Sequence, residues 1–121
     1  MSLAHWFLRS LLLGLAITAI LVPAADAQAP PATPTEQAFL VGATQANLFE
    51  ITTGTIAQRR ARTAAVRRLG RLFVRHHTAM QAQVSAVAGT LGLTLPTALR
   101  PDQQALVGRL RQVRRATFDR L

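Results

Sequence analysis

Apolar residues between positions 66 and 91 recur every three or four residues, and this spacing constrains the fold more than any other sequence feature. The series is Val66, Leu69, Phe73, Met80, Val84, Val87 and Leu91. A period near 3.6 places these side chains on one face of an α-helix, whereas a half-buried strand would show strict alternation. We therefore expect a helix from about Thr63 to about Thr90, with C-capping glycines at positions 89 and 92.

A second helix is predicted from Pro34 to about Arg59. Thr33 can act as its N-cap, Pro34 occupies the first helical position, and Glu36 completes a Thr-x-x-Glu capping box. Its apolar stripe is expected to face the core and consists of Phe39, Ala43, Ala46 and Ala57.

A third helix is predicted to begin near Pro101–Asp102 and to run to the end of the chain. Its inward residues are expected to be Leu106, Leu110, Val113 and Leu121, with Thr117 or Phe118 filling the gap. Glycines inside the predicted helices are interpreted as points of close packing. No alternating strand pattern occurs anywhere in the sequence, so the predicted fold class is all-α.

Residues 1–27 have the layout of a secretory signal peptide. An apolar run from Leu11 to Val22 is followed by Pro23 and by Ala25-Asp26-Ala27, small residues that signal peptidase accepts. We expect cleavage near Ala27 and a location in the periplasm or at the outer membrane. The alternative, an uncleaved anchor, is disfavoured because the run is shorter than the roughly 20 residues of a spanning helix.

After cleavage, residues 28–35 form a Pro-rich linker and residues 36–121 form one domain. The chain has no cysteine, which excludes disulfides, thiol nucleophiles and thiolate metal sites. Ser85 is the one serine after the leader, and there is no glycine-rich phosphate loop. We therefore expect no catalytic site and no enzymatic activity.

All fourteen basic residues are arginine, and thirteen of them follow Ala27, where only four acidic residues occur. Compositional bias is one explanation, and attraction to polyanions is the other. For an exported chain the expected partner is anionic lipid or envelope polysaccharide, and not nucleic acid. The candidate surface, which could also be a simple solvated helix face, contains Arg59, Arg60, Arg62, Arg67, Arg68, Arg71 and Arg75.

Two polar residues share the apolar stripes. Glu50 follows the spacing of the first helix, and His77 follows that of the second. If the helices pair antiparallel, the two side chains could meet as a hydrogen-bonded or ionic pair, contribute half of a metal site, or remain in solvent. Asn47 lies on the flank of the same face and could hydrogen-bond to either of them.

Several strings in these helices resemble those of a known family. They are Phe39-x(3)-Ala43-x(2)-Ala46-Asn47-Leu48-Phe49-Glu50-Ile51-x(2)-Gly54-x(2)-Ala57, then Val66-x(2)-Leu69-x(3)-Phe73, His77-Thr78, Leu91-Gly92-x-Thr94-Leu95-Pro96 and Phe118-Asp119-Arg120. Over residues 36–121 they resemble a family of exported bacterial ferritin-like proteins of unknown function, domain of unknown function 4142. The family has Asp-His-Thr where this chain has His76-His77-Thr78.

The resemblance implies a ferritin-like antiparallel bundle, of which three helices are present and the C-terminal part is missing. A homodimer could then complete a four-helix bundle. Ferritin-like di-iron sites pair Glu with Glu-x-x-His, but Val74 stands three residues before His77. The primary expectation is thus a structural or binding module without a cofactor. The alternatives are a protein that binds iron or another divalent metal through Glu50 and His77 of two chains, and a shortened copy without function.

Overall fold

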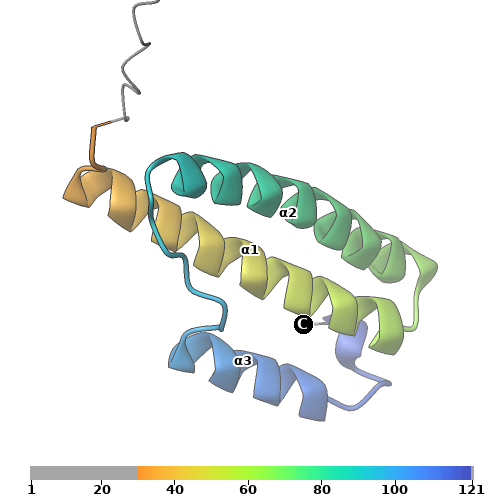
Figure 1. The fold of residues 1–121 in the computed structure, drawn as a ribbon. Helices are drawn as coiled ribbons and strands as arrows, with labels where there is room; N and C mark the ends of the chain where they lie inside the picture. Colours follow the sequence, from red (N-terminus) through yellow and green to blue (C-terminus); the bar gives the residue numbers. More distant parts are fainter. Residues whose placement is uncertain (1–29, 121) are drawn as a thin grey trace, which may run out of the picture.

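The computed structural model describes residues 30–120, which form three α-helices and a short 3₁₀ helix (Figure 1). The elements are α1 (Pro34–Arg60), α2 (Ala64–Thr90), α3 (Pro101–Gln112) and η1 (Phe118–Arg120). The described residues contain no strand, so the all-α prediction is confirmed. None of these helices combines the length and apolar character that crossing a membrane requires. The predicted leader and the inward position of Leu121 lie outside the described residues.

The start of α1 is fixed by the predicted capping box. The Glu36 amide donates to Thr33 Oγ1 at 3.2 Å, and the Thr33 amide donates to Glu36 Oε2 at 2.7 Å. The helix begins at Pro34 because these two bonds satisfy amides that have no partner within the helix. Its end at Arg60 lies one residue beyond the predicted Arg59.

Helices α1 and α2 form an antiparallel hairpin whose backbones approach most closely at Gly54 and Gly70. A Cβ atom on Gly54 would lie 2.8 Å from the Gly70 carbonyl oxygen, and one on Gly70 would lie 2.6 Å from the Gly54 carbonyl oxygen. The prediction that helical glycines are packing points is confirmed at these two positions. It is wrong for Gly42 and Gly108, where an added Cβ would meet no atom within 4 Å.

At its far end α2 stops at Thr90, as predicted, because Gly92 adopts a φ of +64°. The Leu93 amide donates to the Ala88 carbonyl at 2.9 Å, which closes the helix end. The chain then runs without helix to Pro101 and returns along α1.

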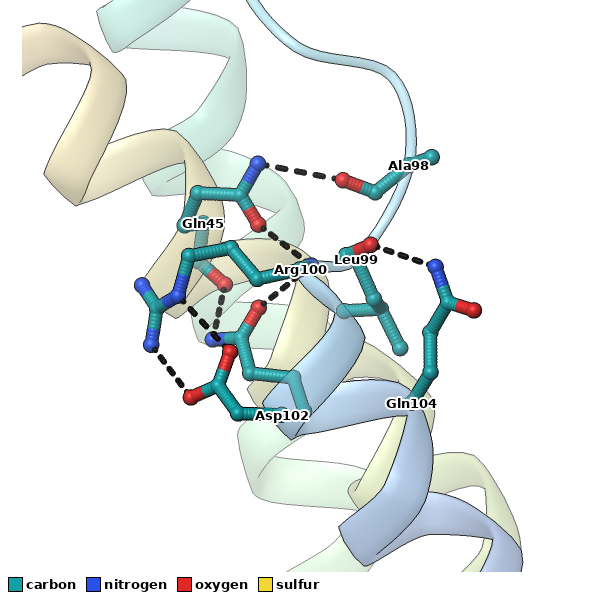
Figure 2. Close-up of polar contacts among 7 residues, drawn as sticks. Gln45, Ala98, Leu99, Arg100, Asp102 and Gln104 are labelled. Atoms are coloured by element: carbon teal, nitrogen blue, oxygen red, sulfur yellow. Dashed lines mark hydrogen bonds and ion pairs between the residues drawn. The ribbon is translucent and has the colours of Figure 1, made fainter.

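Gln45 attaches this returning segment to α1 (Figure 2). Its side-chain amide donates to the Ala98 carbonyl at 3.0 Å, and its Oε1 accepts from the Arg100 amide at 3.2 Å. Gln103, in the first turn of α3, donates to the Gln45 carbonyl at 3.1 Å. These bonds place α3 against the side of α1 that faces away from α2, so α1 lies between the other two helices (Figure 1).

The predicted third helix begins where expected but does not reach the end of the chain. It ends at Gln112, after which the chain turns back and forms η1. Phe118, 5% exposed, enters the apolar core, and the Asp119 carboxylate accepts from the Arg62 and Thr63 amides at 2.9 and 2.7 Å. A continuous helix could not form these contacts with a segment 56 residues earlier in the sequence. Leu106, predicted to face inward, is 44% exposed.

The apolar core is small and lies at the turn end of the hairpin, where α1 connects to α2. It consists of Ile56, Ala61, Val107 and Phe118, with Leu110 and Val113 among the residues packed against it. From the middle of the hairpin toward the other end, the interior contains the polar Thr44, Gln45 and Asn47 together with the buried Leu40 and Ala88.

The two predicted apolar stripes share one side of the hairpin, but this side is not covered within the described chain. Phe39 is 71% exposed, and Leu69, Met80 and Val87 are each 49% exposed. The prediction that these residues are buried is therefore wrong for a single chain, because α3 packs on another side of α1. We call this surface the open face; its apolar members are Phe39, Ala43, Ala46, Leu69, Phe73, Met80, Val84 and Val87, and the half-buried Glu50 and His77 lie on the same two stripes.

Candidate functional site on the outer side of α2

The seven arginines of the candidate surface do not form one patch. Arg60 Nη2 donates to the Val113 carbonyl at 2.5 Å, and Arg67 Nη1 donates to the Ala61 and Arg62 carbonyls at 3.0 and 2.6 Å. These two side chains satisfy carbonyl groups near the end of α1 and of α3, a structural role that arginine commonly has at helix C-termini. Arg59 lines a separate groove beside α3, together with Arg111.

Arg68, Arg71 and Arg75 form a row along the exposed side of α2. Their spacing of three and four residues places them on the same side of the helix. They line a shallow groove of about 570 Å³ with Ala65, Leu69 and Leu72. None of the three takes part in a hydrogen bond or ion pair within residues 30–120. We call Arg68, Arg71 and Arg75 the arginine row.

Three of the four acidic residues within residues 30–120 accept hydrogen bonds from groups outside the arginine row. A side-chain hydrogen bond from Arg100 holds the pKa of Asp102 below its ordinary value, and the Asp102–Arg100 ion pair is 3.1 Å long. Hydrogen bonds from Thr63 and from the Arg62 amide lower the pKa of Asp119. Hydrogen bonds from Thr33 lower the pKa of Glu36. None of these three carboxylates forms an ion pair with Arg68, Arg71 or Arg75 in the described part of the chain.

Apolar side chains are exposed between the arginines. Leu69 is 49% exposed and Leu72 is 37% exposed, although both are large aliphatic residues that are usually buried. The outer side of α2 therefore presents cationic and apolar groups together, an arrangement typical of helices that lie at a membrane surface.

Glu50 and His77, the predicted pair, are each half-buried, but Asn47 is the residue that contacts His77. His77 Nδ1 lies 3.0 Å from Asn47 Oδ1, and the Asn47 amide donates to Gln81 Oε1 at 3.1 Å. Asn47, which is 2% exposed, thus links the middles of α1 and α2. The sequence indicated Asn47 as a hydrogen-bond partner of His77 but did not indicate Gln81. The spacing of Gln81, one helical turn after His77, could have suggested it.

Metal binding by Glu50 and His77 is not supported within one chain. No group of three or more His, Asp or Glu side chains in the described range is arranged to hold a metal ion. The Glu50 carboxylate forms no hydrogen bond within the described residues; its main-chain carbonyl accepts one from the Thr53 hydroxyl at 3.4 Å. Binding that uses two chains stays a prediction, and a native mass spectrum of protein purified without chelator would test it.

Residues 21–121 match the family described as Domain of unknown function (DUF4142), so the chain belongs to this family. The family resemblance predicted from the helix strings is thereby confirmed. Comparisons with curated proteins and with solved structures gave no match.

Proposed function

We propose that this member of the DUF4142 family is an exported, non-enzymatic module that attaches to the anionic surface of a lipid bilayer through α2. The observation that carries the proposal is the arginine row with Leu69 and Leu72 exposed beside it. If α2 lies parallel to the membrane, the three arginines can contact headgroup phosphates at the same time, because they share one side of the helix.

The expected strength is modest. Each arginine near an anionic membrane surface contributes about 1 kcal/mol, so the row contributes about 3 kcal/mol. Burying the exposed parts of two leucines adds on the order of 1 kcal/mol each. Attachment of this kind is reversible, and added salt weakens it because mobile ions screen the arginines.

The leucines favour lipid over envelope polysaccharide as the partner. Both are polyanions, and arginine would be attracted to either of them. A hydrated polysaccharide gives Leu69 and Leu72 no apolar environment, whereas the boundary between headgroups and acyl chains does. We therefore expect the leucines to contribute to binding of vesicles but not to binding of a soluble polyanion.

Export is part of the proposal and is supported by the signal-like features of residues 1–27. When the full-length sequence is expressed in bacteria, the purified protein should begin at Gln28. Its intact mass distinguishes this form from one that retains the leader. A protein that keeps its leader and stays in the cytoplasm would contradict the proposed location.

Vesicle flotation tests the arginine row. Protein is mixed with phosphatidylcholine vesicles that contain or lack phosphatidylglycerol, at low salt and at about 0.15 M salt. The variant R68Q/R71Q/R75Q should bind the anionic vesicles about 100-fold more weakly than the unchanged protein, as expected from the loss of three surface charges.

The matched control is R109Q/R111Q/R114Q, which removes the same charge from α3 and the segment after it. It should retain most of the binding, because these residues lie outside the groove on α2. A second variant, Leu72→Asn, should weaken binding of vesicles and leave binding of dextran sulfate unchanged. Equal losses in the two arginine variants would show that net charge alone attracts the vesicles, and the proposal would then be wrong.

A further inference from the structure

We propose that a second copy of the chain covers the open face, in an antiparallel arrangement with twofold symmetry. The free end of each hairpin, near Phe39 and Val87, would lie against the turn end of the other hairpin. The two α1–α2 hairpins would then form four helices around a shared interior. Leu69 lies at the boundary between the open face and the arginine row and lines a groove on each, but the other residues of the two proposals differ, so either proposal can fail alone.

The charge distribution favours this face for contact between copies. The chain has a formal net charge of +9, so two copies repel each other over most of their surface. The open face has an apolar groove at each end, and no arginine lines either of them. Two copies can therefore approach most closely where their open faces meet.

The exposed apolar side chains of the open face also indicate that a partner covers them. Four large apolar side chains of this face are at least 49% exposed: Phe39, Leu69, Met80 and Val87. They belong to both helices and lie along the whole hairpin. Large apolar side chains exposed on one face of a domain mark an interaction surface, because covering them removes apolar area from water.

The positions of Phe39 and of the turn-end groove along α1 fit a second copy of the same chain, because both lie at similar distances from the middle of the hairpin. Asn47 and His77 meet at the middle of the hairpin. Phe39 lies eight residues before Asn47, which corresponds to about 12 Å along the helix axis. The turn-end groove includes Gly54 and Ala57, seven and ten residues after Asn47, or about 10 to 15 Å in the other direction. A twofold axis at Asn47 and His77 therefore places each Phe39 over the turn-end groove of the other copy.

The two ends also fit in shape. Phe39 is the most exposed large apolar side chain in the described chain, at 71%. The turn-end groove has a volume of about 170 Å³ and is lined by residues that include Leu69, Phe73, Leu110 and Phe118. A phenyl ring inserted there would contact two other aromatic rings and aliphatic side chains, a favourable environment for an aromatic anchor.

The charged residues at the two ends of the hairpin favour an antiparallel pair over a parallel one. Glu36 lines the groove at the free end of the hairpin. Two exposed arginines lie at the turn end: Arg62 in the α1–α2 connection and Arg120 in η1. An antiparallel pair brings Glu36 of each copy toward these arginines, whereas a parallel pair would bring like charges together.

Sedimentation velocity over a range of concentrations is the first test, with protein expressed from the full-length sequence. We expect a monomer–dimer equilibrium. Phe39→Asp should weaken the dimer at least 100-fold, because it places a carboxylate in an apolar groove. Leu106→Asp is the matched control: it changes an exposed leucine of α3, outside the open face, and should leave the dimer intact. Circular dichroism confirms that both variants remain helical.

Disulfide trapping tests the geometry, since the chain has no cysteine of its own. Ala46→Cys is exposed, lies on the open-face stripe and is next to the proposed axis, so oxidation should link two copies. Ala79→Cys is the control; it is exposed four residues after Arg75, on the outer side of α2, and oxidation should not cross-link it. A monomer at every concentration would overturn the proposal. So would a dimer that resists Phe39→Asp, or one that is trapped by Ala79→Cys and not by Ala46→Cys.

Discussion

The two ends of the α1–α2 hairpin are built from the same helices but differ in how they are closed. At the turn end, η1 places Phe118 among Ile56, Ala61 and Val107, and Asp119 bonds to the amides that precede α2. From the middle to the free end, the interior combines the polar Thr44, Gln45 and Asn47 with Leu40 and Ala88, while apolar side chains such as Phe39 and Val87 remain exposed outside it.

This difference shows which contacts stabilise the single chain. The turn end should contribute most of the free energy of folding, because it buries large apolar side chains. The rest of the hairpin buries fewer large apolar side chains and also relies on hydrogen bonds of Gln45 and Asn47, which contribute about 1 kcal/mol each. The apolar residues of the open face should therefore matter little to the fold of one chain and much to association.

Replacement of the two phenylalanines should show the largest contrast. Phe118→Ala removes a buried aromatic ring and should lower the free energy of unfolding by about 3–5 kcal/mol. Phe39→Ala, at a site 71% exposed, should lower it by less than about 0.5 kcal/mol when measured at concentrations where the chain is monomeric. Urea titration of both variants measures the two effects, and equal losses would contradict the difference between the two ends.

Glycine replacements should give the next largest contrast. Gly70→Ala places a Cβ atom 2.6 Å from a backbone oxygen of α1, which must move, at a cost of about 1–3 kcal/mol. Gly42→Ala meets no neighbouring atom and should instead stabilise α1 by up to about 1 kcal/mol through its higher helix propensity. Thermal unfolding compares the two variants. A Gly70→Ala protein as stable as the unchanged chain would show that α1 and α2 do not pack so closely.

Acid should weaken the turn end through Asp119, and this is the smallest of the three expected effects. Because the folded-state pKa of Asp119 is lowered, its contribution to stability is present above the unfolded value of about 3.9 and is lost as the pH falls through the folded value. Asp119→Ala should therefore be less stable than the unchanged protein near neutral pH, and the difference should disappear in strong acid. Urea titrations at several pH values measure this difference. A difference that is independent of pH would show that the carboxylate charge is not involved.

The helices could be predicted from the sequence wherever their limits depend on local contacts. The capping box of Thr33 and Glu36 and the turn at Gly92 involve residues only a few positions apart. The end of α3 could not be predicted in this way, since Phe118 and Asp119 make their contacts with residues of α1 and of the α1–α2 connection.

Periodicity correctly grouped the residues of the open face but did not show that the face is exposed. Spacing reveals which side chains share a side of a helix, and coverage of that side depends on where a third element packs. The arginines illustrate the same limit. Arg67 and Arg68 are neighbours in the sequence, but only Arg67 reaches the carbonyls at the end of α1.

Hydroxyl-radical footprinting tests most directly the central claim that the chain leaves two different surfaces for two different partners. Protein is labelled at low and high concentration, with and without anionic vesicles, and side-chain oxidation is measured by mass spectrometry. We predict that Phe39 and Met80 become protected as the protein concentration rises, whereas Leu72 becomes protected only when anionic vesicles are present. Phe39 that remains equally labelled at every concentration, or protection of Leu72 without vesicles, would contradict the account.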